Sequence, residues 1–251
     1  KANRHGAKMD QELALAILLS GRSALLTGAA GTGKTYLLNT FIAQARKRGK
    51  KVSVTATTGL AATHLGGNTI HSWSGIGVSD HLPNNFFERL SKTRRDVISK
   101  TDVLIIDEIS MLHDFRLDMI DKVLRTVREN DQPFGGIQLV MSGDFFQLPP
   151  VNRPNEQGGG FVVYSDAWQE LQPAVLYLKR QYRQNDEQLL EILTALRTGD
   201  VRRRHVEALL ARTEIEPPDG DITELHTVNV DVDDINIQKL AELPGEERSY
   251  Q

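Results

Sequence analysis

A glycine-rich octapeptide near the start of the chain constrains the fold more than any other feature of the sequence. It has a short apolar run before it and an amphipathic pattern after it. Glycines let the backbone curl so that its N–H groups point at phosphate oxygens, next to the positive end of the following helix. We therefore expect a strand at 24–27, a phosphate-binding loop, and a helix that ends at Gly49. The expected phosphate-binding residues are Gly28, Ala29, Ala30, Gly31, Thr32, Gly33, Lys34 and Thr35.

The last two residues of this loop supply its charge and its metal ligand. Lys34 adds a mobile positive charge for the β- and γ-phosphates of a nucleotide, and the Thr35 hydroxyl is a ligand for Mg²⁺. The alternative is a glycine-rich turn that binds nothing, which the flanking strand and helix disfavour. The sequence therefore predicts a site for ATP or GTP.

A second chemical feature is a continuous apolar run that ends in Asp107 and Glu108. We expect a strand at 103–107 that is buried on both faces, with its carboxyl end at the edge where parallel sheets bind ligands. Asp107 is then expected to hold Mg²⁺, directly or through water, and Glu108 to orient and deprotonate the attacking water. The alternative is that the two carboxylates only keep the end of the strand in contact with water and have no catalytic role. An Asp-Glu pair beside a phosphate loop favours hydrolysis over nucleotide storage.

A third strand, predicted at 137–142, is followed by a polar turn that contains Asp144 and Gln147. The Gln147 amide can both donate and accept hydrogen bonds, so we expect it to sense the γ-phosphate or its attacking water. Pro149 and Pro150 fix the backbone after it, which suits a stiff coupling element. Asp144 is equally consistent with a cap on the turn and with a functional role.

The remaining pattern predicts an α/β fold. Short β-branched runs alternate with helical patterns, which is typical of a mostly parallel sheet flanked by helices. Further strands are expected at 52–56, 174–178 and 222–227. The first helix is expected to begin after an Asp10 cap and to end at Gly21.

Composition excludes several classes of function. The 251 residues include no cysteine, which excludes disulfides, thiol catalysis and cysteine-based zinc sites. The chain has 30 Lys+Arg and 33 Asp+Glu, a net charge of −3, which argues against nucleic-acid binding by bulk charge but not against a local basic groove. No apolar run approaches the ~20 residues that cross a bilayer, so no membrane segment is expected. His64 and His71 have no carboxylate or cysteine partner at ligand spacing, which disfavours a metal role.

The motifs together resemble a known family. In the order found in superfamily one DNA helicases, the chain carries the segments GAAGTGKT, VTATTGLAA, TIHSWSGIG, LIIDEISML, FGGIQLVMSGDFFQLPPV and QYRQND. More narrowly, it resembles the Pif-type (petite-integration-frequency) helicases, with RecD-like helicases as the nearest cousins. The similarity runs from about Gln11 to the end of the chain, and PFGGIQL with GDFFQLPPV is its most specific part.

The resemblance implies further nucleotide contacts. In such helicases a glutamine before the phosphate loop reads the adenine edge, and Gln11 occupies that place; a helix residue that faces water is the alternative. Arg183 matches the family's arginine finger, which neutralises charge on the γ-phosphate in the transition state. Arg180 is a neighbouring competitor for that role, and an ordinary surface ion pair is a further alternative.

The resemblance also implies two DNA-contacting segments, which are Thr57, Thr58 and Gly59, and then His71, Ser72 and Trp73. Hydroxyls and a backbone amide in the first segment would bind phosphates without reading bases. A flat ring in the second would stack on a base, a contact that contributes ~1–3 kcal/mol for any sequence. For Trp73, a place in the core is an equally good interpretation.

By resemblance, residues 1–178 form a RecA-like ATPase lobe of the P-loop class, and residues 179–251 begin a second motor lobe. A small wedge-like subdomain is expected at about 75–100, where Phe86 and Phe87 are expected to pack on the core rather than meet a DNA junction. No later motif of the second lobe is recognised. We therefore expect these residues to bind ATP and Mg²⁺ yet to unwind DNA poorly by themselves.

The expected function is that of an ATP-dependent helicase motor core that moves 5′ to 3′ on single-stranded DNA in repair, recombination, telomere or replication-fork processing. The expected partners are single-stranded DNA and DNA junctions, with a monomeric protein and no membrane. Its expected location is the cytoplasm of a bacterium, or the nucleus or mitochondrion of a eukaryote. Two alternatives stay open, which are a RecD-like or relaxase-linked helicase segment and a nucleotide-controlled DNA-binding module without productive turnover.

Overall fold

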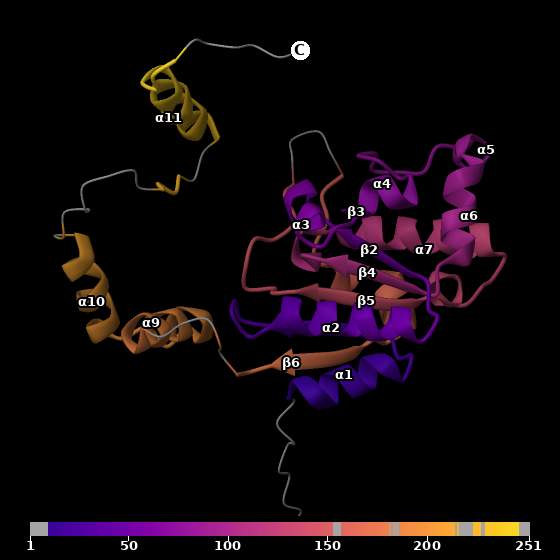
Figure 1. The fold of residues 1–251 in the computed structure, drawn as a ribbon, viewed down its shortest axis with the longest axis horizontal. Coiled ribbons are helices and arrows are strands. Elements are labelled where there is room, and N and C mark those ends of the chain that lie inside the picture. Colours follow the sequence, from indigo (N-terminus) through magenta and orange to yellow (C-terminus); the bar gives the residue numbers. More distant parts are fainter. Residues whose placement is uncertain are drawn as a thin grey trace, which may run out of the picture. The chain divides into compact units, whose positions relative to one another are not determined.

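Apolar runs of the sequence form a six-stranded sheet in which every pairing is parallel and the order is β3-β2-β4-β5-β1-β6 (Figure 1). The strands are β1 (Ala24–Gly28), β2 (Val52–Ala56), β3 (Asn68–Thr69), β4 (Val103–Asp107), β5 (Gln138–Gly143) and β6 (Ala174–Leu178). Three of them, β2, β4 and β6, begin and end at the predicted residues. The two-residue strand β3 was not predicted, because it is too short to show a pattern.

This computed structural model describes residues 10–152, 157–180, 182, 186–213, 215, 223–226 and 229–245. The chain divides into two compact units, Lys1–Leu190 and Glu191–Gln251. Of the strand expected at 222–227, residues 223–226 form no regular structure and the remainder lies outside the described residues. The helices are α1 (Gln11–Leu19), α2 (Lys34–Lys47), α3 (Gly59–His64), α4 (Ile70–Ser74), α5 (Phe86–Arg89), α6 (Lys92–Lys100), α7 (Asp114–Arg128), α8 (Asp166–Leu171), α9 (Glu187–Thr198), α10 (Arg203–Thr213) and α11 (Asn229–Ala241).

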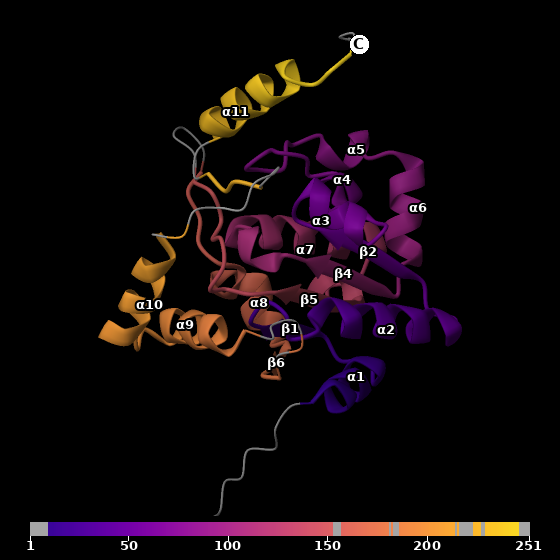
Figure 2. The same ribbon diagram turned by 60° about the vertical axis from the view of Figure 1, so that its left-hand side comes forward.

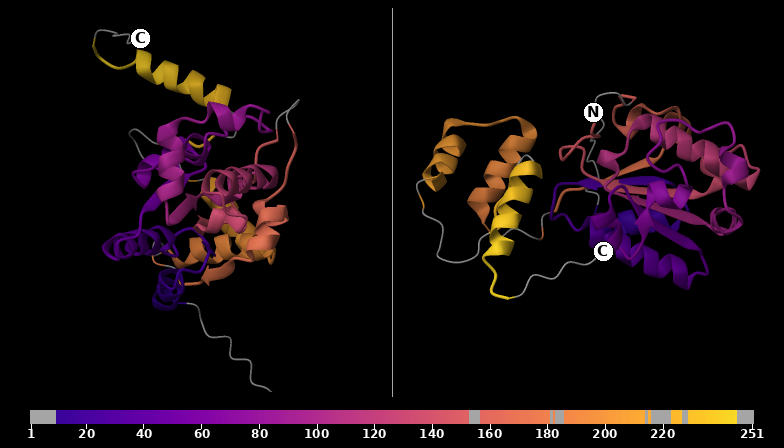
Figure 3. Two further views of the ribbon diagram at one scale, coloured as in Figure 1. Left: turned by 90° about the vertical axis from the view of Figure 1, so that its right-hand side faces the viewer. Right: turned by 90° about the horizontal axis from the view of Figure 1, so that it is seen from above.

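Alternation along the strands divides the core into two layers, because successive side chains of a strand point to opposite faces of its sheet. On one face Ile105 and Val140 pack with α1 and α2. On the other face Ile106 and Met141 pack with α4, α6 and α7. Figures 2 and 3 show these helices on either side of the sheet. Both faces of the central strands are therefore covered, as their continuous apolar runs predict.

The insertion at 75–100 packs on the second of these layers. Phe86 is buried, and its ring contacts Phe87 edge to face at 5.2 Å between centroids. Phe86 belongs to the core cluster beneath α7, and Phe87 is partly buried against that cluster. The expectation that the two phenylalanines pack, rather than present themselves to DNA, is confirmed.

The end of α7 is joined to neighbouring backbone by Arg128. Its guanidinium donates hydrogen bonds to the carbonyl oxygens of Ile98, Ser99 and Thr101, at 3.1, 2.8 and 3.0 Å. It also donates to Gly135, at 2.7 Å. The first two carbonyls lie in the last turn of α6, where backbone acceptors have no partner within the helix. One side chain thus connects α6, α7 and the 3₁₀ turn Pro133–Gly136 before β5.

Replacing Arg128 by alanine is expected to lower the free energy of unfolding by about 3 kcal/mol, because four hydrogen bonds to partly buried backbone are lost and, among the described residues, only the Ile98 carbonyl keeps a second donor, the Thr101 N–H. Urea denaturation of the variant and the wild type measures this difference. Lys122→Ala, an exposed position on the same helix, is the control and should change stability little. Equal stability of Arg128→Ala and Lys122→Ala would show that the four hydrogen bonds contribute nothing net.

In the second unit, Glu191 on α9 accepts hydrogen bonds from Arg204 and His205 on α10, at 2.5 and 3.2 Å. His205 is buried, and its Nδ1 accepts from the backbone N–H of Arg202 at 3.0 Å. This polar cluster holds the first turn of α10 against α9. Within the described part of the chain, no helix combines the length and the apolar character that crossing a membrane requires.

Candidate functional site at the carboxyl edge of the sheet

The predicted motifs follow neighbouring parallel strands and therefore meet at one edge of the sheet. The glycine-rich loop follows β1, Asp144 follows β5, Asp107 ends β4, and Thr57 follows β2. Strands in a sheet are ~4.8 Å apart, so the ends of β1 and β4, separated by β5 alone, lie roughly 10 Å from each other. A triphosphate and its metal ion fit across a span of that size.

The loop after β1 has the backbone of a phosphate cradle. Gly28, Gly31 and Gly33 all have positive φ, and a Cβ on Gly28 would lie 2.5 Å from the carbonyl oxygen of Leu178. Only glycine fits there without displacing β6. The Lys34 ammonium, at the start of α2, lies over the loop and donates to the carbonyl oxygens of Gly28 and Ala29 at 2.7 and 3.1 Å. A mobile cation and a helix N-terminus thus face the same space.

Thr35 and Asp107 are the candidate ligands for Mg²⁺. Thr35 is exposed and Asp107 is half-buried, and hydroxyl and carboxylate oxygens are ligands that Mg²⁺ prefers. Among the described residues, no group of three His, Asp or Glu side chains is arranged to hold a metal ion. The ion would therefore take its other ligands from a nucleotide and from water, as Mg²⁺ commonly does.

Glu108 has an unusual backbone and a perturbed carboxyl group. Its φ of 54° and ψ of 41° are left-handed, a conformation that disfavours residues with a Cβ. Partial burial raises the pKa of its carboxyl, the negative charges of Asp107 and Asp144 raise it further, and Lys34 opposes them. The acidic end of β4 and the loop after β1 lie on the same edge of the sheet, with β5 between their strands. A strained, partly desolvated carboxyl beside charged groups is typical of functional sites.

The turn after β5 is shaped by Asp144. This residue is buried, its carboxylate accepts from the backbone N–H of Phe146 at 3.1 Å, and its carbonyl accepts from that of Gln147 at 3.0 Å. The interpretation of Asp144 as a cap on the turn is confirmed, and a functional role for it stays a prediction. Gln147 is exposed at the end of this turn, on the same sheet edge as the loop.

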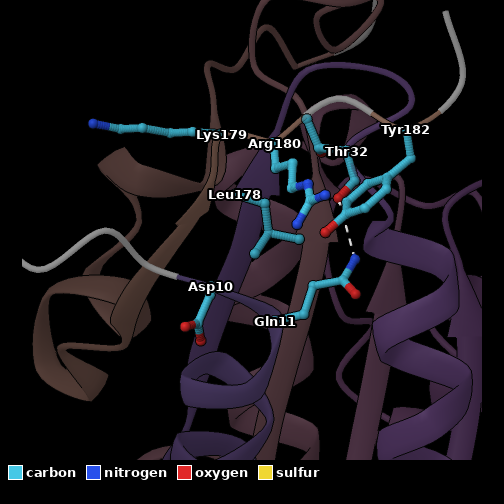
Figure 4. A pocket seen from close by; sticks show the side chains of 7 residues that line it. All are labelled: Asp10, Gln11, Thr32, Leu178, Lys179, Arg180 and Tyr182. Carbon is cyan, nitrogen blue, oxygen red and sulfur yellow. Dashed lines mark hydrogen bonds between the residues drawn. The ribbon is translucent and has the colours of Figure 1, made fainter.

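A pocket of about 540 Å³ adjoins the loop (Figure 4). Its lining residues are Asp10, Gln11, Thr32, Leu178, Lys179, Arg180 and Tyr182. The Gln11 amide makes a long contact of 3.5 Å with the carbonyl oxygen of Thr32, and the backbone N–H of Tyr182 donates to Gly31 at 2.9 Å. The Arg180 guanidinium lies 5.1 Å from the centre of the Tyr182 ring. A flat ring and a hydrogen-bonding amide beside a phosphate loop suit a nucleotide base.

Sequence reasoning did not assign Leu178 or Tyr182 to this pocket. The only available signal was position, since β6 pairs with β1 and brings its end beside the loop. Arg180, named as a competitor for the arginine finger, lies against the tyrosine ring in the pocket. Arg183, the preferred finger, lies outside the described residues, and its role stays a prediction.

The first predicted DNA segment follows β2. Thr58 caps α3, where its hydroxyl accepts from the Ala61 backbone N–H at 3.3 Å, and Gly59 is exposed. Thr57 points inward instead: it is buried, and its hydroxyl donates to the carbonyl oxygen of Glu108 at 2.9 Å. Gly59 is therefore the exposed residue of this segment, and Thr58 is half-buried.

The second predicted DNA segment forms α4. Ser72 is exposed and His71 is half-buried. Burial, together with the charge of Arg116 and the nearby His113, lowers the pKa of His71 to about 4, so its ring is neutral at pH 7. Trp73 is only 8% exposed and packs in the core cluster beneath α7. The expectation that its ring stacks on a base is corrected, because a stacking surface must be open to solvent.

Two polar residues near these segments were not singled out from the sequence. Arg116 and His113 line a small pocket of about 190 Å³ together with Thr57, Thr58 and His71. Arg116 is buried and donates to Asp80, at 2.9 Å, in the inserted segment. Both residues lie at the start of α7, where a helical pattern of apolar residues gave no sign of a polar pocket.

Comparison with known proteins decides the family. The model described as PIF1-like helicase matches residues 7–202. The chain belongs to the PIF1-like helicase family. The ATP-dependent DNA helicase Pif1 of Psychrobacter sp. is 44% identical over 252 residues, which cover 96% of this chain and 38% of that protein. This PIF1-like chain thus spans little more than a third of that relative.

Solved structures agree with the family and the fold. A solved structure of Pif1 helicase, described as two coordinating copies that unwind forked duplex DNA, matches with a TM-score of 0.79 and 32% identity. The match covers 94% of this chain and 57% of that one. Pif1 helicase from Bacteroides in complex with ADP-AlF3 and single-stranded DNA has a TM-score of 0.81 and 31% identity, over 95% and 57%. The PIF1-like chain therefore has the expected P-loop, RecA-like fold.

Proposed function

We propose that this chain is the ATPase part of a DNA helicase motor, which binds ATP with Mg²⁺ and hydrolyses it to move 5′ to 3′ along single-stranded DNA. The observation that carries the proposal is that Lys34 and Glu108 follow β1 and β4 at one edge of the sheet, with β5 alone between these strands. A cation for the triphosphate and a base for water are the two groups that hydrolysis needs in one place.

The residues of this edge divide the chemistry between them. Lys34 and the loop amides bind the phosphates, and Thr35 and Asp107 hold the metal ion. Bound Mg²⁺ supplies positive charge that offsets the charge developing on the phosphate oxygens. Glu108 orients the attacking water and takes its proton, a task for which a raised pKa is favourable because it makes the carboxylate more basic.

Two further residues respond to the γ-phosphate in this proposal. Gln147 lies at the exposed end of the turn after β5, and Arg183 follows the pocket residue Tyr182 in the sequence. Gln11 would read the adenine edge in the pocket that it lines beside the loop. The Bacteroides relative is described in complex with ADP-AlF3, which supports nucleotide binding by this chain as well.

Single-stranded DNA is proposed to cross the same sheet edge, farther along toward β3. Gly59 and Ser72 are exposed there and offer a backbone amide and a hydroxyl, half-buried Thr58 offers a second hydroxyl, and His71 offers a neutral ring. Such groups bind the sugar-phosphate backbone and read no bases. Solved relatives that are described with single-stranded DNA or at forked duplex DNA support this partner.

The biological setting follows from the relatives rather than from the site. The relative described as unwinding forked duplex DNA supports a role in processing forks. A single copy is proposed as the moving unit, with two copies on one fork as a second arrangement. These 251 residues by themselves are proposed to bind nucleotide and to unwind DNA poorly.

The proposal is tested by the rate of ATP hydrolysis in the presence and absence of oligo-dT. We expect stimulation of roughly tenfold, a common size for coupling between two binding sites. A blunt DNA duplex of equal length is the control and should stimulate far less.

A flat response to oligo-dT would contradict the motor. If the protein still bound ATP and DNA in that case, the result would favour a nucleotide-controlled DNA-binding module. Equilibrium binding of a fluorescent ATP analogue and of labelled oligo-dT separates this outcome from a protein that binds neither.

A further inference from the structure

Thr57 makes contacts that the DNA-binding role does not use. Its hydroxyl donates to the carbonyl oxygen of Glu108 at 2.9 Å, and its backbone N–H donates to the carbonyl oxygen of Asp107 at 3.1 Å. The paired register of β2 and β4 ends one residue earlier, at Ala56 and Asp107. Thr57 therefore extends the link between the two strands onto the acidic pair itself.

The Glu108 carbonyl is held from two sides. Besides the Thr57 hydroxyl, it accepts from the backbone N–H of Met111 at 3.2 Å, in the 3₁₀ turn that follows. Two donors on one carbonyl fix the plane of the peptide that leaves Glu108. Because this residue is left-handed, a conformation with little intrinsic preference, such external contacts decide where its side chain points.

Thr57 also borders the DNA side of the edge. It lines the small pocket that contains Thr58 and His71, and its next neighbour Thr58 caps α3. Gly59, two residues on, is exposed. Only one peptide unit and one hydrogen bond thus connect this segment to the Glu108 carbonyl. A movement of the segment on binding a DNA phosphate would reach the carbonyl through them.

From these contacts we propose that Thr57 is a positioning residue, which couples DNA on the segment Thr58–Gly59 to the orientation of Glu108. The inference rests on the proposed function, since it concerns how DNA stimulates hydrolysis. It differs from the expectation drawn from sequence, in which the Thr57 hydroxyl binds DNA phosphate directly. In this arrangement the hydroxyl faces the acidic pair, and DNA acts on it through the backbone.

The chain offers a matched control two residues earlier. The Thr55 hydroxyl donates to the carbonyl oxygen of Ile105 at 2.6 Å, between the same two strands, and Thr55 is fully buried. Thr55→Val and Thr57→Val therefore remove the same kind of hydrogen bond from the same pair of strands. They differ in that the acceptor of Thr57 belongs to Glu108.

The test compares Thr57→Val, Thr57→Ser and Thr55→Val with the wild type. For each protein, kcat and KM for ATP are measured at saturating oligo-dT and without DNA, and oligo-dT affinity is measured by fluorescence anisotropy. We expect Thr57→Val to lower the DNA-stimulated kcat about tenfold, the effect of losing one hydrogen bond that acts on the transition state. KM and oligo-dT affinity should stay within about twofold, Thr57→Ser should recover most of kcat, and Thr55→Val should keep it.

Several outcomes would overturn the inference. If Thr55→Val lost as much DNA-stimulated kcat as Thr57→Val, the cause would be weaker strand pairing. If oligo-dT affinity fell together with kcat, Thr57 would be a DNA ligand. A wild-type kcat in Thr57→Val would exclude any coupling through its hydroxyl. Failure of oligo-dT to stimulate the wild type would instead contradict the proposed function, so the two failures are distinguishable.

Discussion

Glu108→Gln is expected to lower the turnover of ATP by about 10³-fold while the protein still binds the nucleotide. The amide has nearly the shape of the carboxyl and can still hydrogen-bond water, but it cannot take up the proton of the attacking water. General-base catalysis contributes ~10²–10⁴-fold, which sets the size of the loss. Steady-state hydrolysis gives the rate, and titration with a fluorescent ATP analogue gives the affinity.

A second glutamate in the chain controls for the backbone. Glu129 ends α7 with φ of 51° and ψ of 44°, close to the values of Glu108, but it is exposed at the end of the helix. Glu129→Gln should leave both turnover and affinity unchanged. If Glu108→Gln kept normal turnover, the base would be elsewhere and the assignment of this edge would be wrong.

The sheet edge that we propose as the nucleotide site could be assembled from the sequence because its signals are local and continuous. The run that became β4 is apolar without interruption and ends at Asp107, so both its burial and its end were visible. The loop around Lys34 is set by glycines whose positive φ the sequence itself suggests. Parallel strands then bring the two segments to one edge without further information.

The direction in which side chains point could not be predicted in the same way. Thr57 and Thr58 are adjacent and identical, yet one hydroxyl faces Glu108 and the other caps α3. Trp73 lies one residue from the exposed Ser72, and only packing beneath α7 decides that its ring is buried. These differences depend on where a helix begins and on which strand lies beside it, and a single sequence carries no separate signal for either.

The pocket beside the loop shows the same limit at longer range. Gln11 and Tyr182 are separated by most of the first unit, and they come together because α1 precedes β1 and β6 pairs with β1. Gln11 was predicted through family resemblance, whereas Tyr182 was quoted as part of a motif without a role. The arrangement became visible once the order of the strands was known.

Lys34→Met is expected to weaken nucleotide binding by about 100-fold and to remove measurable turnover with it. Methionine keeps the unbranched apolar stem but has no charge, so the phosphates lose a cation that contacts them directly. Hydrogen bonds with a charged partner contribute ~1.5–3 kcal/mol, which corresponds to about 10–100-fold in affinity. The same fluorescent analogue measures this loss.

Comparing Lys34→Met with Glu108→Gln tests whether phosphate binding and water activation depend on different residues. Lys47→Met, at the far end of α2 and exposed, removes one positive charge from the same helix and should bind nucleotide normally. If Lys34→Met bound ATP as well as the wild type did, the loop would not be the phosphate site, whatever the effect of Glu108→Gln. Loss of binding in Lys34→Met with retained binding in Glu108→Gln would separate the group that holds the triphosphate from the group that activates water. This outcome is expected if Lys34, beside the loop after β1, binds the phosphates and Glu108, after β4, activates the water.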